Sequence, residues 1–244
     1  MLDGLYAAAA GMQAQQTQLE AIANDLANES TPGYQAAKVG FRDLLYTSGG
    51  ASSGSTVATG AGSAADIIGR SQIQGSLQQT GQPFDVAIQG PGYIEVRRPD
   101  GTIGLTRNGV LQLNAQRHLT TSVGMELQPP ITIPQGISPG QVKIDPNGTV
   151  HAGTRTLGRI SLVDVPAPDK LLADGNSVFS PTAASGAIRP AAGTTVQQGA
   201  IEASNVDANV EMATMITTQR NFSMASKAIQ YQDQMAQIAN QVKK

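Results

Sequence analysis

The side chains that most often carry out chemistry are scarce in this sequence. It contains two histidines, His118 and His151, and neither lies in the HxxxH or HExxH spacing that binds zinc. It contains no cysteine, which excludes a disulfide framework, a thiolate zinc site and a cysteine nucleophile. For both histidines a solvent-facing side chain is the default expectation. The sequence therefore predicts no catalytic residue and no metal site.

Acidic and glycine-rich segments give no stronger indication of a reaction. The acidic residues of the middle region lie singly in strand or turn contexts, and sequence alone pairs none of them into a glycosidase dyad: Asp85, Glu95, Asp100, Asp145 and Asp164. We expect Asp100 and Asp145 to cap turns. The glycine-rich stretches at Gly60 and Gly90 match neither the dinucleotide-binding nor the P-loop spacing, so we expect no cofactor.

The composition favours a protein that packs against other chains. The 244 residues carry a formal net charge of -2, and 14% are charged, against about 25% in average soluble domains. A chain with so few charges is expected to bury surface against neighbours, and its charge balance argues against nucleic acid as a partner. No segment approaches the roughly 20 apolar residues of a membrane span. The start of the chain, with Asp3 and a short alanine run, does not resemble a cleaved signal peptide.

The first segment of the chain has the pattern of an amphipathic helix. Four apolar residues recur every seven positions, and Ile22 lies on the same face: Leu5, Met12, Leu19 and Leu26. Pro32 and Gly33 end the pattern. One interpretation is a surface helix of a single globular domain, and the other is a helix that takes part in assembly.

The last segment predicts a second, longer helix. Its first heptad line contains Val210, Thr217, Met224, Tyr231 and Ile238, and a second line beside it contains Met215, Phe222 and Ile229. The segment from about Asp207 to Val242 lacks Gly and Pro, which predicts a helix on the order of 50 Å long. A capping signal, 204–207, precedes it. The two terminal helices are therefore expected to form a coiled coil through these apolar residues, which we take as the assembly interface.

The middle of the chain alternates short β-type segments with turns. Segments such as 84–88, 93–97, 104–107 and 142–144 are each followed by glycine-containing turns, and Asp-Gly or Asn-Gly supplies the positive φ of a tight hairpin. The stretch 48–65 has no charge and is expected to be a linker. The predicted fold class is α+β, with an N-terminal assembly helix (1–35), a Gly/Ser-rich connector (36–75), a central antiparallel β domain (76–200) and a C-terminal assembly helix (201–244).

Three separated segments of the sequence carry recognisable motifs. The first has the pattern Asn-x-Leu-Ala-Asn, followed by Thr-x-Gly and an aromatic residue, through Asn24, Leu26, Ala27, Asn28, Thr31, Gly33 and Tyr34. The second, at 198–207, contains Glu202, Ser204, Asn205 and Val206, and the third lies at 85–93 and 106–109. In this order they resemble the N-terminal motif, the C-terminal motif and the start of the β domain of the bacterial flagellar rod and hook protein family. Within the family, the stretch 41–46 most resembles the distal rod branch, whereas 157–179 is also similar to the proximal rod branch.

The resemblance implies a structural subunit and not an enzyme. It implies a chain that is exported unfolded by the flagellar type III apparatus, without a cleaved signal, into the cell-envelope or periplasmic space. There it polymerises into the hollow helical tube of the basal-body rod and transmits torque. The implied partners are copies of itself, neighbouring rod and hook axial proteins, the export apparatus, and ring or bushing proteins around the rod.

Two alternatives remain open from the sequence. The chain could be a proximal rod or hook-type axial subunit of the same family. It could also belong to a different class, a secreted carbohydrate-binding β domain with dimerising helices. That class requires a concave site with converging polar groups, and no residue cluster in the sequence demands one.

Overall fold

Two long helices lie near the two ends of the chain. The structure, a computed structural model, describes residues 2–44, 46–48 and 58–242. Helix α1 spans Leu2–Ala27 and helix α2 spans Ala208–Val242, which confirms both predicted helices. Oδ1 of Asp207 accepts the backbone N–H groups of Asn209 at 3.0 Å and Val210 at 3.3 Å. The predicted capping signal therefore does start α2.

Between the helices, the described residues form short strands. Their bounds are β1 (Ala37–Asp43), β2 (Tyr46–Ser48), β3 (Ala58–Gly60), β4 (Ser63–Arg70), β5 (Leu77–Gln79), β6 (Val86–Gln89), β7 (Tyr93–Arg97), β8 (Ile103–Thr106), β9 (Leu111–Leu113), β10 (Leu119–Thr121), β11 (Glu126–Leu127), β12 (Val142–Ile144), β13 (Thr149–Ala152), β14 (Arg155–Arg159), β15 (Leu162–Asp164), β16 (Leu172–Ala173), β17 (Val178–Ser180), β18 (Arg189–Pro190), β19 (Thr195–Gln198) and β20 (Ala200–Glu202). Two 3₁₀ turns, η1 (Pro139–Gln141) and η2 (Pro168–Lys170), interrupt them. The central strand pairs run antiparallel, so the α+β class is confirmed.

The chain divides into two compact units whose boundaries differ from the expected ones. The helical unit contains residues 1–27, 37–68 and 207–244, and the β unit contains residues 28–36 and 69–206. The family segment 28–36 therefore belongs to the β unit. Of the expected connector, the described residues 37–44, 46–48 and 58–68 group with the helices.

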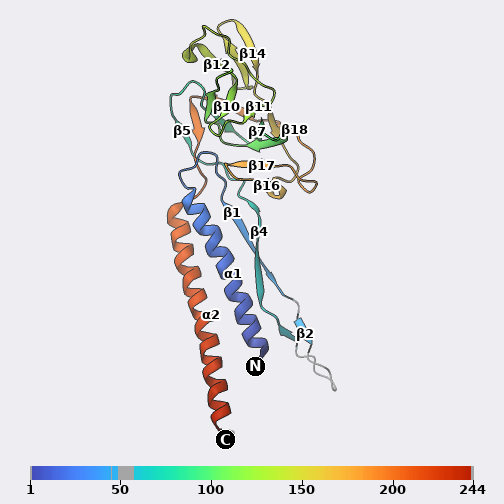
Figure 1. Cartoon of the computed structure of the whole chain (residues 1–244), viewed down its shortest axis with the longest axis vertical. Helices are drawn as coiled ribbons and strands as arrows, with labels where there is room; N and C mark the ends of the chain where they lie inside the picture. The colour runs from blue at the N-terminus through green and yellow to red at the C-terminus, as the bar shows by residue number, and fades with distance from the viewer. Residues whose placement is uncertain (1, 45, 49–57, 243–244) are drawn as a thin grey trace. The chain divides into compact units, whose positions relative to one another are not determined.

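In the helical unit, α1 and α2 lie side by side and run antiparallel (Figure 1). Gly4 is next to Gln232, since a Cβ on Gly4 would lie 3.0 Å from its Nε2, and Asp25 interacts electrostatically with Glu211. Strand β1 pairs with β4 and β2 pairs with β3, so the described part of the expected linker is ordered as strands. Residues 49–57 of that linker lie outside the described residues.

In the β unit, the largest sheet has the order β16-β17-β8-β7-β11-β10-β9, with β15 pairing both β7 and β18. The strands β12-β13-β14 form a separate three-stranded sheet, and β19-β6 and β20-β5 form two-stranded sheets. The C-terminal strands β19 and β20 thus pair with strands from the start of the β unit.

Strand β7 packs against a hydrophobic cluster on each of its two faces. Successive side chains of a strand point to opposite faces. Ile94 and Val96 belong to the main core cluster, whereas Tyr93 belongs to a second cluster with Leu105 and Phe179. The rings of Tyr93 and Phe179 meet edge to face with centroids 5.8 Å apart. Both faces of the sheet are therefore buried at this strand.

The glycines of the predicted turns serve two different purposes. Gly148 has a φ of 82°, as expected for its Asn-Gly turn. Gly109 follows an asparagine too, but a Cβ there would lie 1.6 Å from the backbone O of Val86. The expectation of a positive φ is wrong for Gly109, because the requirement at this position is a close approach of two backbone segments.

Candidate assembly interface

The α1 residues expected at the interface lie only partly inside the helical unit. Ile22 is buried, whereas Leu5, Met12, Leu19 and Leu26 are half-buried. The deepest positions of α1 also include Ala14 and Ala21, two small residues that let neighbouring backbones approach closely. The packing against α1 thus leaves part of its apolar line uncovered.

Helix α2 turns a different face toward α1 from its main apolar line. Thr218 is 2% exposed, and its hydroxyl donates to the backbone O of Thr214 at 2.8 Å. Gln232, two heptads further along the chain, lies against Gly4. Met215 and Ile229, from the second predicted line, flank this face and are half-buried. The contact within one chain therefore uses small and polar residues together with part of the second line.

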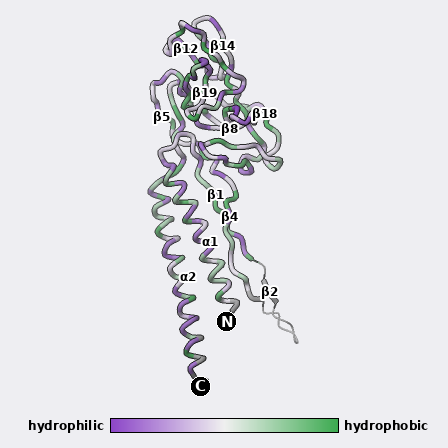
Figure 2. Tube along the Cα trace, viewed as in Figure 1, coloured by the Kyte–Doolittle hydropathy of each residue, from purple (hydrophilic) through white to green (hydrophobic). Residues whose placement is uncertain are grey.

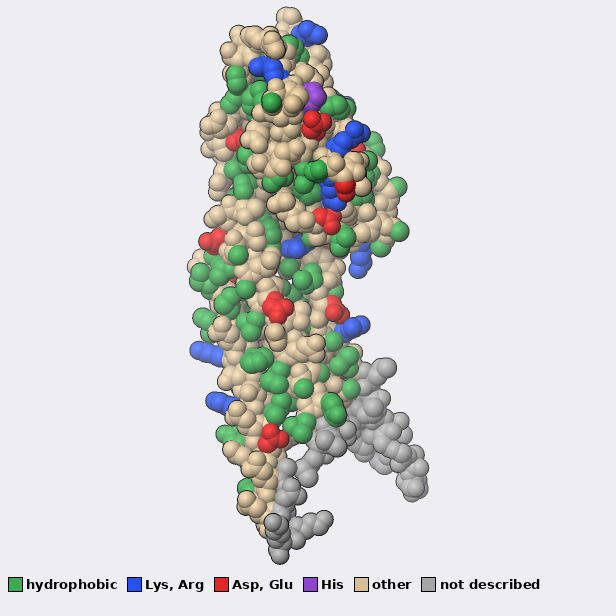
Figure 3. Space-filling model, viewed as in Figure 1, with side chains coloured by type: hydrophobic (Ala, Val, Ile, Leu, Met, Phe, Trp, Pro, Cys, Tyr) green, Lys and Arg blue, Asp and Glu red, His purple; other side chains and the backbone are tan. Residues whose placement is uncertain are grey.

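The first predicted line of α2 remains at the surface of the single chain. We call Val210, Thr217, Met224, Tyr231 and Ile238 the α2 stripe. Val210 is 58% exposed, Met224 61%, Tyr231 65% and Ile238 60%. Figure 2 shows that α2 mixes hydrophobic and hydrophilic residues along its length, and Figure 3 shows hydrophobic side chains at the surface of the helical unit. Phe222, from the second line, is 36% exposed.

Charged groups at one end of the helix pair are held close together. Asp25 is 2% exposed, and both of its carboxylate oxygens accept the backbone N–H of Ala37 at 3.1 Å, which fixes the start of β1. Burial raises the pKa of the Glu211 carboxyl, and the nearby charges of Asp25 and Asp207 raise this pKa further. The surroundings of Glu211 therefore make the charged form of its carboxyl less favourable than it would be in water.

Within the β unit, the family-motif residue Glu202 forms a buried ion pair that the sequence did not predict. Its Oε2 lies 2.9 Å from Nε of Arg107, and the two side chains are 3% and 2% exposed. Its Oε1 accepts the backbone N–H of Gly75 at 3.0 Å. Arg107 also donates to the backbone O of Gly90 at 2.8 Å. Glu202 thus joins β20 to residues on either side of β6.

Asn205, another motif residue, ties three segments of the β unit together. Its backbone N–H donates to the backbone O of Tyr34 at 3.3 Å, and its Oδ1 accepts the N–H of Ala36 at 2.8 Å. Its Nδ2 donates to the carbonyls of Ser71 at 3.1 Å and Ile73 at 2.8 Å. The side chain therefore uses its donor and acceptor groups on two different segments of the chain.

The Thr-x-Gly motif forms a tight turn that lies against β8. The backbone N–H of Gly33 donates to the backbone O of Glu202 at 2.8 Å. Gly33 has a φ of 67°, and a Cβ there would lie 2.4 Å from the backbone N of Asn108. Thr31 donates through its hydroxyl to Oδ1 of Asn28 at 3.2 Å. Only glycine fits at the tip of this turn.

The remaining motif residues have separate roles. Tyr34 accepts a hydrogen bond from Arg70 at 3.1 Å, and the guanidinium lies 5.6 Å from its ring centroid. Ser204 accepts the N–H of Val206 at 3.3 Å. Asn24, Leu26 and Ala27 lie at the end of α1, in the helical unit. The structure thus brings Gly33, Tyr34, Glu202 and Asn205 together within the β unit.

Two buried charged residues, Arg107 of the β unit and Asp25 of the helical unit, were not predicted as site residues. Arg107 appeared only as part of a family-like segment. The sequence did contain a signal for Arg107, which is a single cation between an apolar strand and a turn. A cation that is buried in such a place needs a partner. Nothing local to Asp25 distinguishes it from an exposed helical aspartate.

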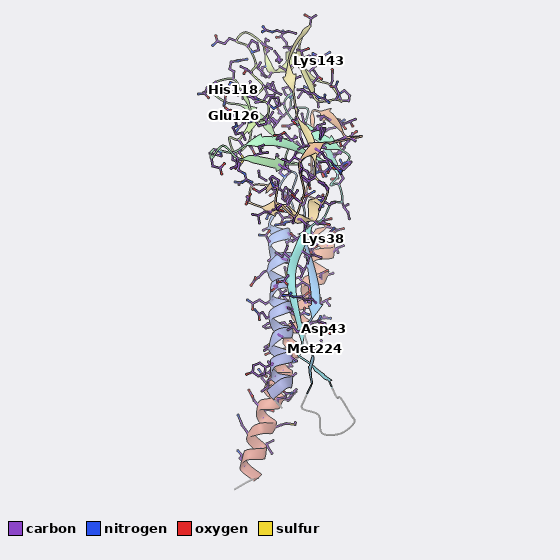
Figure 4. All side chains as sticks on the ribbon, turned by 90° about the vertical axis from the view of Figure 1, so that its right-hand side faces the viewer. Lys38, Asp43, His118, Glu126, Lys143 and Met224 are labelled. Atoms are coloured by element: carbon purple, nitrogen blue, oxygen red, sulfur yellow. The ribbon has the colours of Figure 1, made fainter. Side chains whose placement is uncertain are left out.

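Both histidines are paired with carboxylates, so the expectation that they face solvent needs correction. Nδ1 of His118 lies 3.1 Å from Glu126, and the two side chains are labelled in Figure 4. Nε2 of His151 lies 3.0 Å from Asp145, and its Nδ1 lies 3.1 Å from the hydroxyl of Thr156. Asp145 follows β12, His151 lies on β13 and Thr156 on β14. This row of polar contacts ties the three strands of one sheet together.

Other candidate sites are weak in the part of the chain that the structure describes. Among these residues there is no group of three or more His, Asp or Glu placed to hold a metal ion. None of the described helices combines the length and apolar character needed to cross a bilayer. An open groove of about 310 Å³ in the β unit is lined mainly by proline and aliphatic residues, with Arg159, Ser161 and Thr194 as its polar members. This lining gives little support to a carbohydrate site.

Three family descriptions match successive parts of the chain. "Flagella basal body rod protein" matches residues 5–35, "Flagellar hook protein FlgE/F/G D1 domain" matches residues 87–152, and "Flagellar basal body rod FlgEFG protein C-terminal" matches residues 197–242. The first and third contain the motif residues of α1, the Thr-x-Gly turn and the Glu202 segment. The order of the three matches is the order that the sequence motifs predict.

Curated relatives match over the full length of the chain. A flagellar basal-body rod protein FlgG of Caulobacter vibrioides is 37% identical, over 99% of this chain and 100% of its own. The protein of the same name from Borreliella burgdorferi is 36% identical, over 100% of both chains. One from Buchnera aphidicola is 33% identical, over 99% of this chain and 100% of its own. The chain therefore belongs to the flagellar basal-body rod protein family, and within it most resembles the distal rod protein FlgG.

Proposed function

We propose that this chain is a structural subunit of the flagellar basal-body rod, and that it polymerises into a hollow helical tube that transmits torque from motor to hook. The observation that carries the proposal is the α2 stripe, which has the heptad spacing of a helix interface but no cover within its own chain. On this account the protein acts through buried side chains and catalyses no reaction.

Covering the α2 stripe with a neighbouring subunit would contribute favourable free energy to assembly. Full burial of a large apolar side chain stabilises a contact by about 1.5 to 3 kcal/mol. Val210, Met224, Tyr231 and Ile238 are all more than half exposed, so each can contribute part of this amount when a neighbour covers it. The half-buried α1 line of Leu5, Met12 and Leu19 can contribute in the same way.

The relative lengths of the two helices also favour a partner from another subunit. Gly4 lies against Gln232, and α1 starts at Leu2, whereas α2 continues to Val242. The end of α2, from about Met235, therefore extends beyond the part of α1 that the structure describes. Met235 and Ile238, both about 60% exposed, lie on this extension. A copy of the same chain, offering its own apolar lines, would cover them.

The antiparallel helix pair provides the geometry for a coiled coil. Gly4 and Asp25 are 21 positions apart on α1, and Glu211 and Gln232 are 21 positions apart on α2. Both separations equal three heptads, so each helix keeps the same face toward the other along the contact. We propose that the pair becomes a complete coiled-coil layer when neighbouring subunits add their helices. Contacts of this heterologous kind, when they do not close into a ring, produce filaments.

The other proposed partners follow from membership of the family. They are the neighbouring rod and hook axial proteins, the type III export apparatus that carries the unfolded chain, and the ring or bushing proteins around the rod. The proposed location is the basal body, within the cell envelope. Proximal rod and hook-type subunits are less favoured, since the full-length relatives described above carry the FlgG name.

A substitution in the α2 stripe tests the proposal. Met224→Asp places a charge where the single chain is already 61% exposed, so the fold of the monomer should be unaffected. In a polymer, the same carboxylate would be buried without a partner, at a cost of several kcal/mol per subunit. We expect normal monomer melting, normal export and no rods in electron micrographs of basal bodies.

The matched control is Gln230→Asp, on a face of α2 that also carries Ser226, Lys227 and Asp233. It adds the same charge outside the stripe and should build rods of normal length. Normal rods with both variants would show that the stripe is not an assembly surface. Export is measured first, because a Met224→Asp chain that is not exported would also build no rods.

A further inference from the structure

We infer that residues 200–206 are a closing segment, without which the β unit does not form a stable fold, so that the chain stays unfolded until nearly all of it has been made. The inference depends on contacts within the β unit. These contacts do not include the α2 stripe.

The first contact is the ion pair of Glu202 and Arg107. Arg107 lies just after β8 in the middle of the chain, and its side chain is 2% exposed. Before Glu202 arrives, folding the β unit would bury this guanidinium without a counter-charge. Leaving one member of a buried pair without its partner is strongly destabilising. Partial folding of the middle region is therefore opposed by a charge that only the closing segment neutralises.

The second set of contacts joins the closing segment to the N-terminal part of the β unit. Gly33 donates to the backbone O of Glu202, and Ala36 donates to Oδ1 of Asn205. Strand β20 supplies the pairing partner of β5, with Glu202 opposite Leu77. Without the closing segment, these backbone groups lose their protein partners, and the loss is costly at Gly33, which is buried. Segment 28–36 and strand β5 are thus held by residues far away in sequence.

The place of the closing segment in the chain makes this a late step. A chain is synthesised from its N-terminus, and only α2 and the terminal residues follow Ser204 to Val206. The β unit therefore completes its fold only near the end of synthesis. For a rod subunit that must be exported unfolded, this delay keeps the β unit unfolded while the chain is being synthesised. That consequence rests on the proposed function, whereas the closing step itself does not.

Arrested nascent chains of the full coding sequence test when the β unit closes. We propose to stall synthesis so that the last residue outside the ribosome is 198, 206 or 242. Each stalled chain is then treated briefly with protease. We expect the 198 chain to be digested, and the 206 and 242 chains to yield a protected β unit. Equal protection of the 198 chain would overturn the inference, and would leave the proposed rod function untouched.

Point variants of the complete chain test the chemical basis. Hydrogen exchange at the backbone amides of Ile94 and Leu105 reports the stability of the β unit. Glu202→Ala should accelerate this exchange by about a hundredfold or more, because Arg107 stays buried and unpaired. The double variant Arg107→Met with Glu202→Met removes both charges and should recover most of the protection.

The control is Asp164→Asn, which breaks the pair with Arg189, whose side chain is 58% exposed. Its exchange should stay within about threefold of the wild-type chain, as expected for a surface pair. Two results would overturn the inference. One is unchanged exchange in Glu202→Ala, and the other is a double variant that exchanges as fast as the single one.

Discussion

At the scale of single residues, the Thr-x-Gly motif is explained by the space around Gly33. A Cβ at this position would lie 2.4 Å from the backbone N of Asn108 and 2.6 Å from the backbone C of Arg107. Both atoms belong to the peptide bond between Arg107 and Asn108, which directly follows β8 and cannot move without disturbing that strand. We expect Gly33→Ala to lower the free energy of unfolding of the β unit by about 3 kcal/mol, as measured by denaturant titration.

Gly153→Ala is the matched control for this prediction. Its φ of 61° is close to the 67° of Gly33, but no atom lies within 4 Å of the Cβ it would gain. The control therefore contains only the strain of a left-handed residue, about 1 to 2 kcal/mol. Equal losses in the two variants would mean that crowding by Asn108 and Arg107 contributes nothing.

Glu211 gives the helical unit a predictable dependence on pH. Burial raises the pKa of its carboxyl in the folded chain above the ordinary value of a glutamate. The folded state then binds the proton more readily than the unfolded state, so stability falls as pH rises between the two pKa values. Glu211→Gln should remove this term and raise helical stability at neutral pH by less than about 1 kcal/mol, since the group is partly exposed.

Melting of the helical circular dichroism signal at pH 4.5 and pH 7 checks this prediction. The difference between the wild-type chain and Glu211→Gln should be small at the lower pH and larger at neutral pH. Glu20→Gln, which changes an exposed glutamate of α1, serves as the control. A Glu211→Gln chain that is less stable at neutral pH would mean that the dipole at the start of α2 outweighs burial.

Single residues also show what the sequence can and cannot predict. Asp207 was predicted as part of a cap, because a cap depends on residues two or three positions away. Arg107 and Glu202 are 95 positions apart, and their pairing depends on how β8 and β20 are brought together. Local patterns predict contacts of the first kind, whereas contacts of the second kind require the complete fold.

At the scale of elements, both helices were predicted closely, but the face that α2 turns toward α1 was predicted only in part. Heptad spacing identified the α2 stripe as an interface, and the expected partner was the N-terminal helix of the same chain. In the structure, the face carrying Thr218 meets α1 instead. A helix with two apolar lines has two possible contact faces, and periodicity alone does not rank them.

The end of α2 provides the prediction at this scale. Deleting residues 230–244 removes Tyr231, Met235 and Ile238, which are all more than half exposed in the single chain. The β unit should keep its melting temperature, because it contains only residues 28–36 and 69–206. We expect rod assembly to be lost, as measured by swimming and by electron microscopy of basal bodies.

A full-length chain with Gln230→Glu, on a face of α2 that also carries Ser226, Lys227 and Asp233, is the control for the deletion. It should swim normally. Normal motility of the shortened chain would contradict an assembly role for the end of α2, and a lowered melting temperature of the β unit would contradict its independence from this helix.

At the scale of the whole molecule, the sequence predicted the order of the parts better than which residues belong to each part. Helix, β region and helix follow one another as expected. The segments 28–36 and 69–75 were assigned to the N-terminal helix and the connector, yet they group with the β unit. Asn205 and Glu202 hold them there through hydrogen bonds to Ala36 and Gly75. Such discontinuous units cannot be read from local composition, because the residues that complete them lie at the far end of the chain.

Site-specific photocrosslinking in isolated basal bodies tests the central claim most directly. A photoreactive amino acid at position 224 would lie in the α2 stripe, whereas one at position 230 would lie on a face that carries Ser226, Lys227 and Asp233. If the stripe joins subunits, position 224 should yield a ladder of crosslinked multimers of this chain, and position 230 should yield far fewer. Monomers alone from position 224, in basal bodies that contain the protein, would contradict the account.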